Sequence, residues 1–212
     1  QERNVMETKF KELASKLNIT LSDAEVDKFF LYKKILKEWN EKINLTSIVD
    51  DNEILIKHFI DSLTIEKYVP KNAKVIDVGT GAGFPGIPLK IVRPDMELVL
   101  LDSLNKRIIF LQTVINELEL KNIQAIHGRA EEFVSKEREA YDIVTSRAVA
   151  RLNVLLEYML PFVKVGGRCI CMKSFEIEEE LKAGNEFNLS SEEKAFFDAL
   201  GDDPEVKELM KD

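Results

Sequence analysis

The sequence contains few of the residues on which metal centres and disulfide frameworks are built. Its 212 residues include two cysteines and two histidines, and these four are scattered without the spacing of a ligand set. No apolar run approaches the ~18 residues that a membrane-spanning helix needs, and residues 1–4 lack the charged-then-apolar layout of a signal peptide. We therefore expect no bound metal, no membrane partner and a reducing, cytoplasmic location.

Acidic side chains outnumber basic ones over the whole chain, 38 to 30, which gives a formal net charge of −8. The excess is local, because residues 176–212 hold 13 acidic and 4 basic side chains, a net charge of −9. Residues 1–175 have a net charge of +1. The overall acidity therefore does not exclude a nucleic-acid partner, since basic clusters in the first 175 residues can still meet phosphate.

The pattern of apolar residues divides the chain into three segments. Residues 1–70 read as a helical cap, with helical spacing over 2–17, after a capping box at Ser22–Glu25, and over 51–68. Residues 71–175 alternate strands with helices, which predicts an α/β domain built on a Rossmann-like, doubly wound parallel sheet. Residues 176–212 read as an acidic tail with short helical patterns.

Within the predicted α/β domain, each element can be bounded from the sequence. Strands are expected near residues 74–78, 97–101, 123–127, 141–145 and 168–172. Helices are expected near residues 86–92, 104–119, 130–136 and 151–163. In such sheets, ligands bind at the carboxyl ends of the strands.

The most informative segment joins the first predicted strand to the next helix. Gly79, Gly81 and Gly83 follow the apolar run Val75–Val78 directly. A strand that runs through a glycine-rich turn into a helix brings backbone close to a ligand. The second predicted strand ends in Asp102, whose carboxylate can take two hydroxyls of a ribose. Together these features predict a site for a nucleoside cofactor.

Two cofactors fit this turn to different degrees. Residues 81–86 satisfy the dinucleotide pattern G-x-G-x-x-G, which keeps NAD open. Asp77 favours S-adenosylmethionine, because its carboxylate can organise the loop around the aminocarboxypropyl group but would repel a pyrophosphate. Pro85 and Pro88 stand at the helix start, where a pyrophosphate would need free N–H groups. A tight turn without a ligand is the remaining interpretation.

Three further positions are candidates for chemistry. Ala130 and Glu131 follow the third predicted strand, where a backbone N–H and an acidic side chain can bind the edge of an adenine. The alternative is a helix N-terminus whose acidic residues only stabilise the helix. Arg147 follows the fourth strand and can pair with a phosphate or a cofactor carboxylate, or stack on a base; a surface salt bridge is the alternative. His58 lies on an otherwise apolar helical face, which favours a satisfied buried histidine over a catalytic one.

These segments together resemble the small-subunit (16S) rRNA guanine-N7 methyltransferase family, RsmG, also called GidB. The resemblance covers roughly residues 10–175 and rests on Ile43–Ser47, His58–Ser62, Val75–Pro88, Leu101–Ser103 and Ser146–Ala148. It implies a class I methyltransferase fold with a helical N-terminal extension. It also implies S-adenosylmethionine as the donor and 16S rRNA, or the small ribosomal subunit, as the partner that is methylated at guanine N7.

The resemblance also implies roles for individual residues. Within its pattern Gly79 and Phe84 line the donor, Asp102 takes the ribose, Ala130 and Glu131 hold the adenosine part, and Arg147 reaches the site. Guanine N7 has an in-plane lone pair and no proton to lose, so its methylation needs placement and exclusion of water instead of a general base. Phe84 is a candidate wall for the base.

Residues 188–212 do not match the family, and a gene fusion, a truncation and engineering all stay open as their origin. A non-catalytic module that binds the donor or a partner is therefore the alternative function, with an NAD-binding protein behind it. The sequence does not indicate an oligomeric state, and a monomer is favoured.

Overall fold

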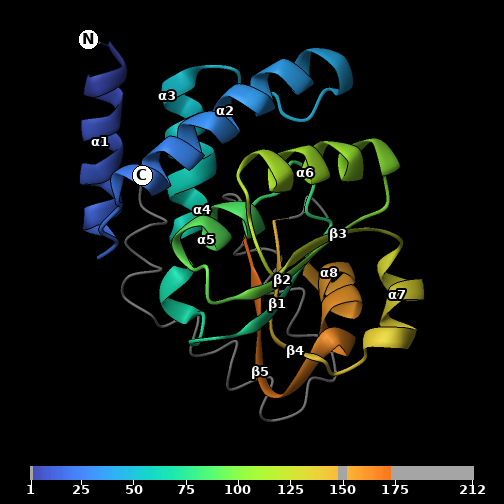
Figure 1. The fold of residues 1–212 in the computed structure, drawn as a ribbon. Coiled ribbons are helices and arrows are strands. Elements are labelled where there is room, and N and C mark those ends of the chain that lie inside the picture. Colours follow the sequence, from blue (N-terminus) through green and yellow to red (C-terminus); the bar gives the residue numbers. More distant parts are fainter. Residues whose placement is uncertain (1, 148–151, 173–212) are drawn as a thin grey trace. The chain divides into compact units, whose positions relative to one another are not determined.

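The computed structural model of the protein describes residues 2–147 and 152–172 (Figure 1). Residues 2–147 and 157–172 belong to one compact unit, which contains every candidate site residue. The predicted acidic tail of residues 176–212 lies outside the described residues. Within the described ranges, no helix is long and apolar enough to cross a membrane, and no three His, Cys, Asp or Glu side chains gather as a metal site.

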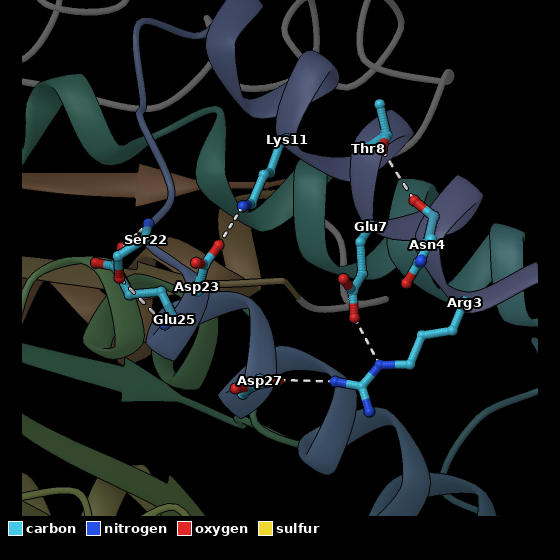
Figure 2. Close-up of polar contacts among 9 residues, drawn as sticks. All are labelled: Arg3, Asn4, Glu7, Thr8, Lys11, Ser22, Asp23, Glu25 and Asp27. Atoms are coloured by element: carbon cyan, nitrogen blue, oxygen red, sulfur yellow. Dashed lines mark hydrogen bonds and ion pairs between the residues drawn. The ribbon is translucent and has the colours of Figure 1, made fainter. Parts of the chain in front are cut away.

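Two helices begin the chain, α1 (Glu2–Lys16) and α2 (Asp23–Ile43), close to the predicted bounds. The predicted capping box is confirmed: Glu25 N–H donates to Ser22 Oγ over 3.2 Å, and Ser22 N–H donates to Glu25 Oε2 over 2.7 Å (Figure 2). Because two otherwise orphaned N–H groups are satisfied reciprocally, the start of α2 is fixed at Ser22.

Exposed ion pairs and buried rings join α1 to α2. Arg3 pairs with Asp27 at 2.7 Å, and Lys11 with Asp23 at 2.5 Å (Figure 2). These pairs face solvent and are screened by salt, so they add little to stability. Phe10 of α1 meets Phe29 of α2 edge to face, with ring centroids 5.0 Å apart and both rings buried. The apolar contact is therefore what holds the two helices together.

The helix predicted over residues 51–68 is instead a series of short elements. They are α3 (Asp51–Glu53), a π-helix η1 (Ile54–Ile60), α4 (Asp61–Leu63) and a 3₁₀ helix η2 (Glu66–Tyr68). The wide turn is seen where Asp61 N–H donates to the Ile56 carbonyl, five residues back. It buries the adjacent residues His58 and Phe59 together. Apolar spacing alone could not distinguish this turn from an α-helical one.

The five strands of the described chain form one parallel sheet in the order β3-β2-β1-β4-β5, which confirms the doubly wound α/β prediction. Their bounds are β1 (Lys74–Val78), β2 (Glu97–Asp102), β3 (Ile123–His127), β4 (Tyr141–Ser146) and β5 (Val163–Cys171). The connecting helices are α5 (Gly86–Val92), α6 (Asn105–Glu117), α7 (Ala130–Glu137), α8 (Leu152–Met159) and the 3₁₀ helix η3 (Leu160–Phe162).

Strand β5 begins five residues earlier than predicted, at Val163 instead of residue 168. Tyr141 pairs with Val163 and Ile143 pairs with Arg168, so the register shifts between these two pairs. The extra residues form a bulge that contains two glycines, and glycines weaken the apolar signal from which a strand is predicted.

The helical N-terminal segment and the sheet share one hydrophobic core. Helices α5 and α6 lie on the side of the sheet that faces α2, while α7 contacts η3 (Figure 1). A continuous cluster of buried apolar side chains runs from Phe10 through Phe59 to Ile143. Since both segments contribute to this core, the boundary near residue 70 between a helical cap and an α/β domain stays a prediction from the sequence.

The strand order reverses beside β1, which pairs with β2 on one side and with β4 on the other. All five strands are parallel, so their carboxyl ends lie along one edge. In open α/β sheets, ligands bind in the crevice at such a switch point. The glycine-rich loop after β1 and Asp102 at the end of β2 both lie there.

Candidate functional site

Asp77 fixes the glycine-rich loop at two points. Its Oδ2 accepts hydrogen bonds from Thr80 Oγ1 over 2.8 Å and from Gly86 N–H over 2.9 Å. One carboxylate oxygen thus joins the start of the loop to the start of α5. The side chain is fully buried, and its Oδ1 has no hydrogen-bond partner among the described residues. Burial raises the pKa of Asp77 to about 7, although both hydrogen bonds act to lower it.

The raised pKa of Asp77 predicts a stability that falls as pH rises. The unfolded carboxyl ionises at about pH 4 and the folded one at about pH 7, so the folded state binds the extra proton between these values. Asp77→Asn cannot ionise. Between pH 5 and pH 8, its free energy of unfolding relative to the wild type should therefore rise by about 1–3 kcal/mol. Urea unfolding of both proteins at the two pH values measures this, and parallel pH profiles would contradict it.

The loop is fixed to β2 on one side and borders open space on the other. The N–H groups of Gly79 and Thr80 donate to the Leu101 carbonyl over 2.9 and 3.1 Å. Gly79 and Gly81 have φ of +66° and +60°, and a Cβ added at either would meet no atom within 4 Å. Gly79 is exposed. The loop backbone can therefore be approached closely by a ligand, as a cofactor held at this edge requires.

Asp102 ends β2 beside the loop and is 2% exposed. Its Oδ2 accepts from Gly81 N–H over 2.9 Å and from Arg107 Nη1 over 3.3 Å, while its Oδ1 accepts from Leu104 N–H over 2.9 Å. Two of these donors are backbone groups that hold the carboxylate in place. Arg107 is the one of the three that can swing away, because its side chain is 34% exposed. Asp102 therefore orders the loop, and it is also the residue predicted to accept hydrogen bonds from a ribose.

The residues predicted to hold an adenosine lie at the end of β3. Ala130 and Glu131 form the first turn of α7, and the side chain of Glu131 is exposed. Gly128 N–H donates to the Asp102 carbonyl over 3.0 Å, which ties the end of β3 to the end of β2. His127 Nε2 donates to the Ser103 carbonyl over 3.0 Å and strengthens the same link. The end of β3 thus lies next to Asp102, and Ala130 and Glu131 follow it in the chain.

Arg147 follows β4 and is partly buried, with 22% of its side chain exposed. Its Nη2 donates to His58 Nδ1 over 2.8 Å, and its Nη1 lies 3.2 Å from Asp61 Oδ2 and 3.3 Å from the Lys57 carbonyl. Its Cζ lies 4.8 Å from the centroid of the Phe84 ring. The guanidinium therefore links the end of β4 to the π-helix, and the ion pair that was the alternative for this residue is present.

His58 is a satisfied buried histidine, as predicted, with 6% of its surface exposed. A guanidinium has only donors, so His58 Nδ1 accepts from Arg147 and Nε2 carries the proton. Nε2 then donates to Thr46 Oγ1 over 2.8 Å. Burial, and then the charge of Arg147, lowers the pKa of His58 to about 4. The ring is therefore neutral at neutral pH, and it serves to hold Arg147.

Phe84 is buried, with 4% of its surface exposed. Its ring stacks on His58, with centroids 4.4 Å apart and an interplanar angle of 12°, and it contacts Tyr32 and Arg147. The buried ring offers little surface to a substrate base in this arrangement, so its predicted role as a wall stays a prediction. Because Phe84 directly follows Gly83, its backbone can still line the donor, and this role also stays a prediction.

Sequence reasoning missed Tyr32, whose side chain contacts the glycine-rich loop. The helical pattern places Tyr32 among the apolar residues of α2, and its ring is fully buried there. Its hydroxyl donates to the Ala82 carbonyl, at the centre of the glycine-rich loop. A hydroxyl on an otherwise apolar helical face was the available signal, because a buried hydroxyl requires a partner.

Comparison with known proteins adds a family to this geometry. The family model described as rRNA small subunit methyltransferase G (GidB) matches residues 25–206. The prediction that residues 188–212 do not match the family is therefore wrong for residues 188–206. The ribosomal RNA small subunit methyltransferase G of Acetivibrio thermocellus is 58% identical over 171 residues, which cover 79% of this chain and 71% of that protein. The protein of the same name from Alkaliphilus oremlandii is 56% identical over 175 residues, which cover 81% of this chain and 73% of that protein.

A solved structure supports the fold. A putative S-adenosyl-L-methionine-dependent methyltransferase from Methanococcus maripaludis superposes with a TM-score of 0.51 at 18% sequence identity. The match covers 80% of this chain and 81% of that one. At this identity the likeness concerns the fold alone, and it agrees with the class I methyltransferase architecture that the sequence predicts.

Proposed function

Because the chain belongs to the rRNA small subunit methyltransferase G family, we propose that it transfers a methyl group from S-adenosylmethionine to N7 of a guanine in 16S rRNA. The observation that carries the proposal is the loop of residues 79–83, held by Asp77 and Asp102 at the switch point of the sheet. The open space beside Gly79 and Gly81 fits a ligand that contacts backbone.

The residues present fit this donor. Asp77 would keep the loop folded around the aminocarboxypropyl group, and Gly79 and Gly81 would let the backbone approach it. Asp102 would accept from the ribose hydroxyls, for which the side chain of Arg107 gives way. The first turn of α7, with its exposed Glu131, would lie along the adenosine. When bound, the donor supplies a methyl group on a positively charged sulfur.

The surroundings of the site suit methylation at a ring nitrogen that carries no proton. His58, with a pKa of about 4 and both ring nitrogens engaged, is not poised as a general base at neutral pH. What remains for the protein is to place N7 in line with the methyl group and to exclude water. Arg147 at the rim carries a positive charge that can meet the phosphates of an RNA.

The partner follows from the same family membership. The small ribosomal subunit, or its free 16S rRNA, would present the guanine, and a base in folded RNA must be splayed out to reach such a site. A cytoplasmic location follows from that partner. A monomer is the state we propose.

A calorimetric titration tests the cofactor half of the proposal. The full chain should bind S-adenosylmethionine in the micromolar range, about −8 kcal/mol, and should bind NAD much more weakly. One reason is Asp77, whose buried and partly ionised side chain disfavours a pyrophosphate, and another is that Pro85 and Pro88 offer it no N–H groups. Tight binding of NAD, with none of S-adenosylmethionine, would overturn the proposal in favour of a dinucleotide-binding protein.

Arg147→Ala tests the substrate half. The variant should lose methyl transfer to small ribosomal subunits by about tenfold or more, because the rim loses a cation and His58 and Asp61 lose the donor that holds them. Arg147→Lys is the control: it keeps the charge but cannot reach both partners with one planar group. A melting scan must find both variants folded. If Arg147→Ala folds and methylates at the wild-type rate, Arg147 is a bystander.

A further inference from the structure

A buried hydrogen bond joins helix α2 to the glycine-rich loop. Tyr32 lies in the middle of α2, fifty residues before the loop, and its hydroxyl donates to the carbonyl of Ala82. The side chain is fully buried. A buried hydroxyl must have a partner, and here the partner is the backbone between the second and third glycines of the loop.

The loop is shaped to receive this hydroxyl. A Cβ on Gly83 would lie 2.7 Å from the Tyr32 hydroxyl oxygen, closer than real Cβ atoms come to non-bonded heavy atoms. The sheet holds the other side of the loop, because Gly79 and Thr80 donate to the Leu101 carbonyl and Gly81 donates to Asp102. Residues 79–81 are thus fixed from the sheet, while Ala82 is fixed from α2.

The ring and the hydroxyl of Tyr32 make different contacts. The ring stacks on Phe59, with centroids 5.2 Å apart and an interplanar angle of 22°, and it contacts Phe84 at 5.6 Å. These contacts place the ring in the core shared by the helices and the sheet. A phenylalanine would keep them, so the hydroxyl can be removed alone.

We infer that Tyr32 is a positioning residue for donor binding, acting through the Ala82 carbonyl to hold the loop in its binding conformation. The helical N-terminal segment is then part of the donor site and not only a cover for the sheet. This inference rests on the proposed function, since it takes the loop as the place where the donor binds.

The experiment compares Tyr32→Phe with Tyr141→Phe in the full chain. Tyr141 is also a fully buried tyrosine, but it begins β4 at the opposite edge of the sheet, and its hydroxyl bonds Glu137. Titration should give Tyr32→Phe a dissociation constant for S-adenosylmethionine about 3- to 10-fold above the wild-type value. Tyr141→Phe should stay within about 2-fold of it, at a comparable fall in melting temperature.

Two further measurements separate positioning from packing. The KM for the donor in methyl transfer should rise with the dissociation constant, while kcat at saturating donor should stay within about 2-fold. Amide hydrogens of residues 79–84 should exchange faster in Tyr32→Phe than in Tyr141→Phe.

Equal donor affinity in the wild type and Tyr32→Phe would overturn the inference and leave the proposed function standing. So would a Tyr32→Phe chain that fails to fold, because the hydroxyl would then be holding the core itself. A wild-type chain that binds no S-adenosylmethionine would instead overturn the proposed function, and the inference would fall with it.

Discussion

Gly83→Ala should lose most of its affinity for S-adenosylmethionine together with about 2–4 kcal/mol of its free energy of unfolding. Gly83 has a φ of +96°, a conformation that strains any residue with a Cβ. The new Cβ would also lie 2.7 Å from Ile87 Cδ1 and 2.7 Å from the Tyr32 hydroxyl. Both neighbours are buried, so the loop must shift instead of the side chains.

Gly166→Ala is the matched control for this variant. Gly166 has a φ of +80°, so it shares the backbone strain of Gly83, but a Cβ there would meet no atom within 4 Å. It lies in the bulge near the start of β5, away from the loop, so we expect a loss of about 1 kcal/mol of stability and an unchanged donor affinity. Urea unfolding and calorimetric titration measure both quantities. If Gly83→Ala behaves like Gly166→Ala, the close fit between the loop and Tyr32 does not govern the site.

Asp102→Ala should weaken S-adenosylmethionine binding by ~1–3 kcal/mol. The carboxylate serves two purposes, and the substitution removes both. It orders the loop by accepting from Gly81 N–H, and it is the acceptor that the ribose hydroxyls would use. Calorimetric titration of the variant gives the change in affinity, and an unchanged value would remove Asp102 from the site.

A carboxylate at the opposite edge of the sheet provides the control for Asp102. Asp142 accepts from Lys74 N–H over 2.8 Å and pairs with Lys164, near the start of β4. Asp142→Ala should therefore destabilise the fold without weakening donor binding. If both variants weaken binding in proportion to their loss of stability, the effect of Asp102 is general and not local.

The parts of this site that the sequence predicts are those with a local signal. An apolar run that ends in an acid marks the carboxyl end of a buried strand, which placed Asp77 and Asp102 at the edge where they lie. Glycines at alternate positions mark a turn with unusual backbone angles, which placed the loop. Because the strands are parallel, their carboxyl ends lie along one edge, and the two aspartates and the glycine-rich loop therefore meet there.

The parts that the sequence does not predict are partnerships between distant residues. Periodicity indicates which face of a helix is buried but not which group meets it, so the buried hydroxyl of Tyr32 signals a need for a partner without identifying Ala82 as that partner. The contact between Arg147 and His58 joins residues 89 apart. It also depends on the π-helix, whose wide turn is indistinguishable from an α-helix in apolar spacing.

The most direct test of the account is the identity of the methylated nucleoside. Small ribosomal subunits that lack the modification are incubated with the full chain and S-adenosylmethionine carrying a labelled methyl group. The rRNA is then digested to nucleosides, which are separated by chromatography and identified by mass spectrometry. The account predicts label in 7-methylguanosine of 16S rRNA, at a rate that falls in Asp102→Ala. Label in another nucleoside, or none from a chain that binds the donor, would contradict it.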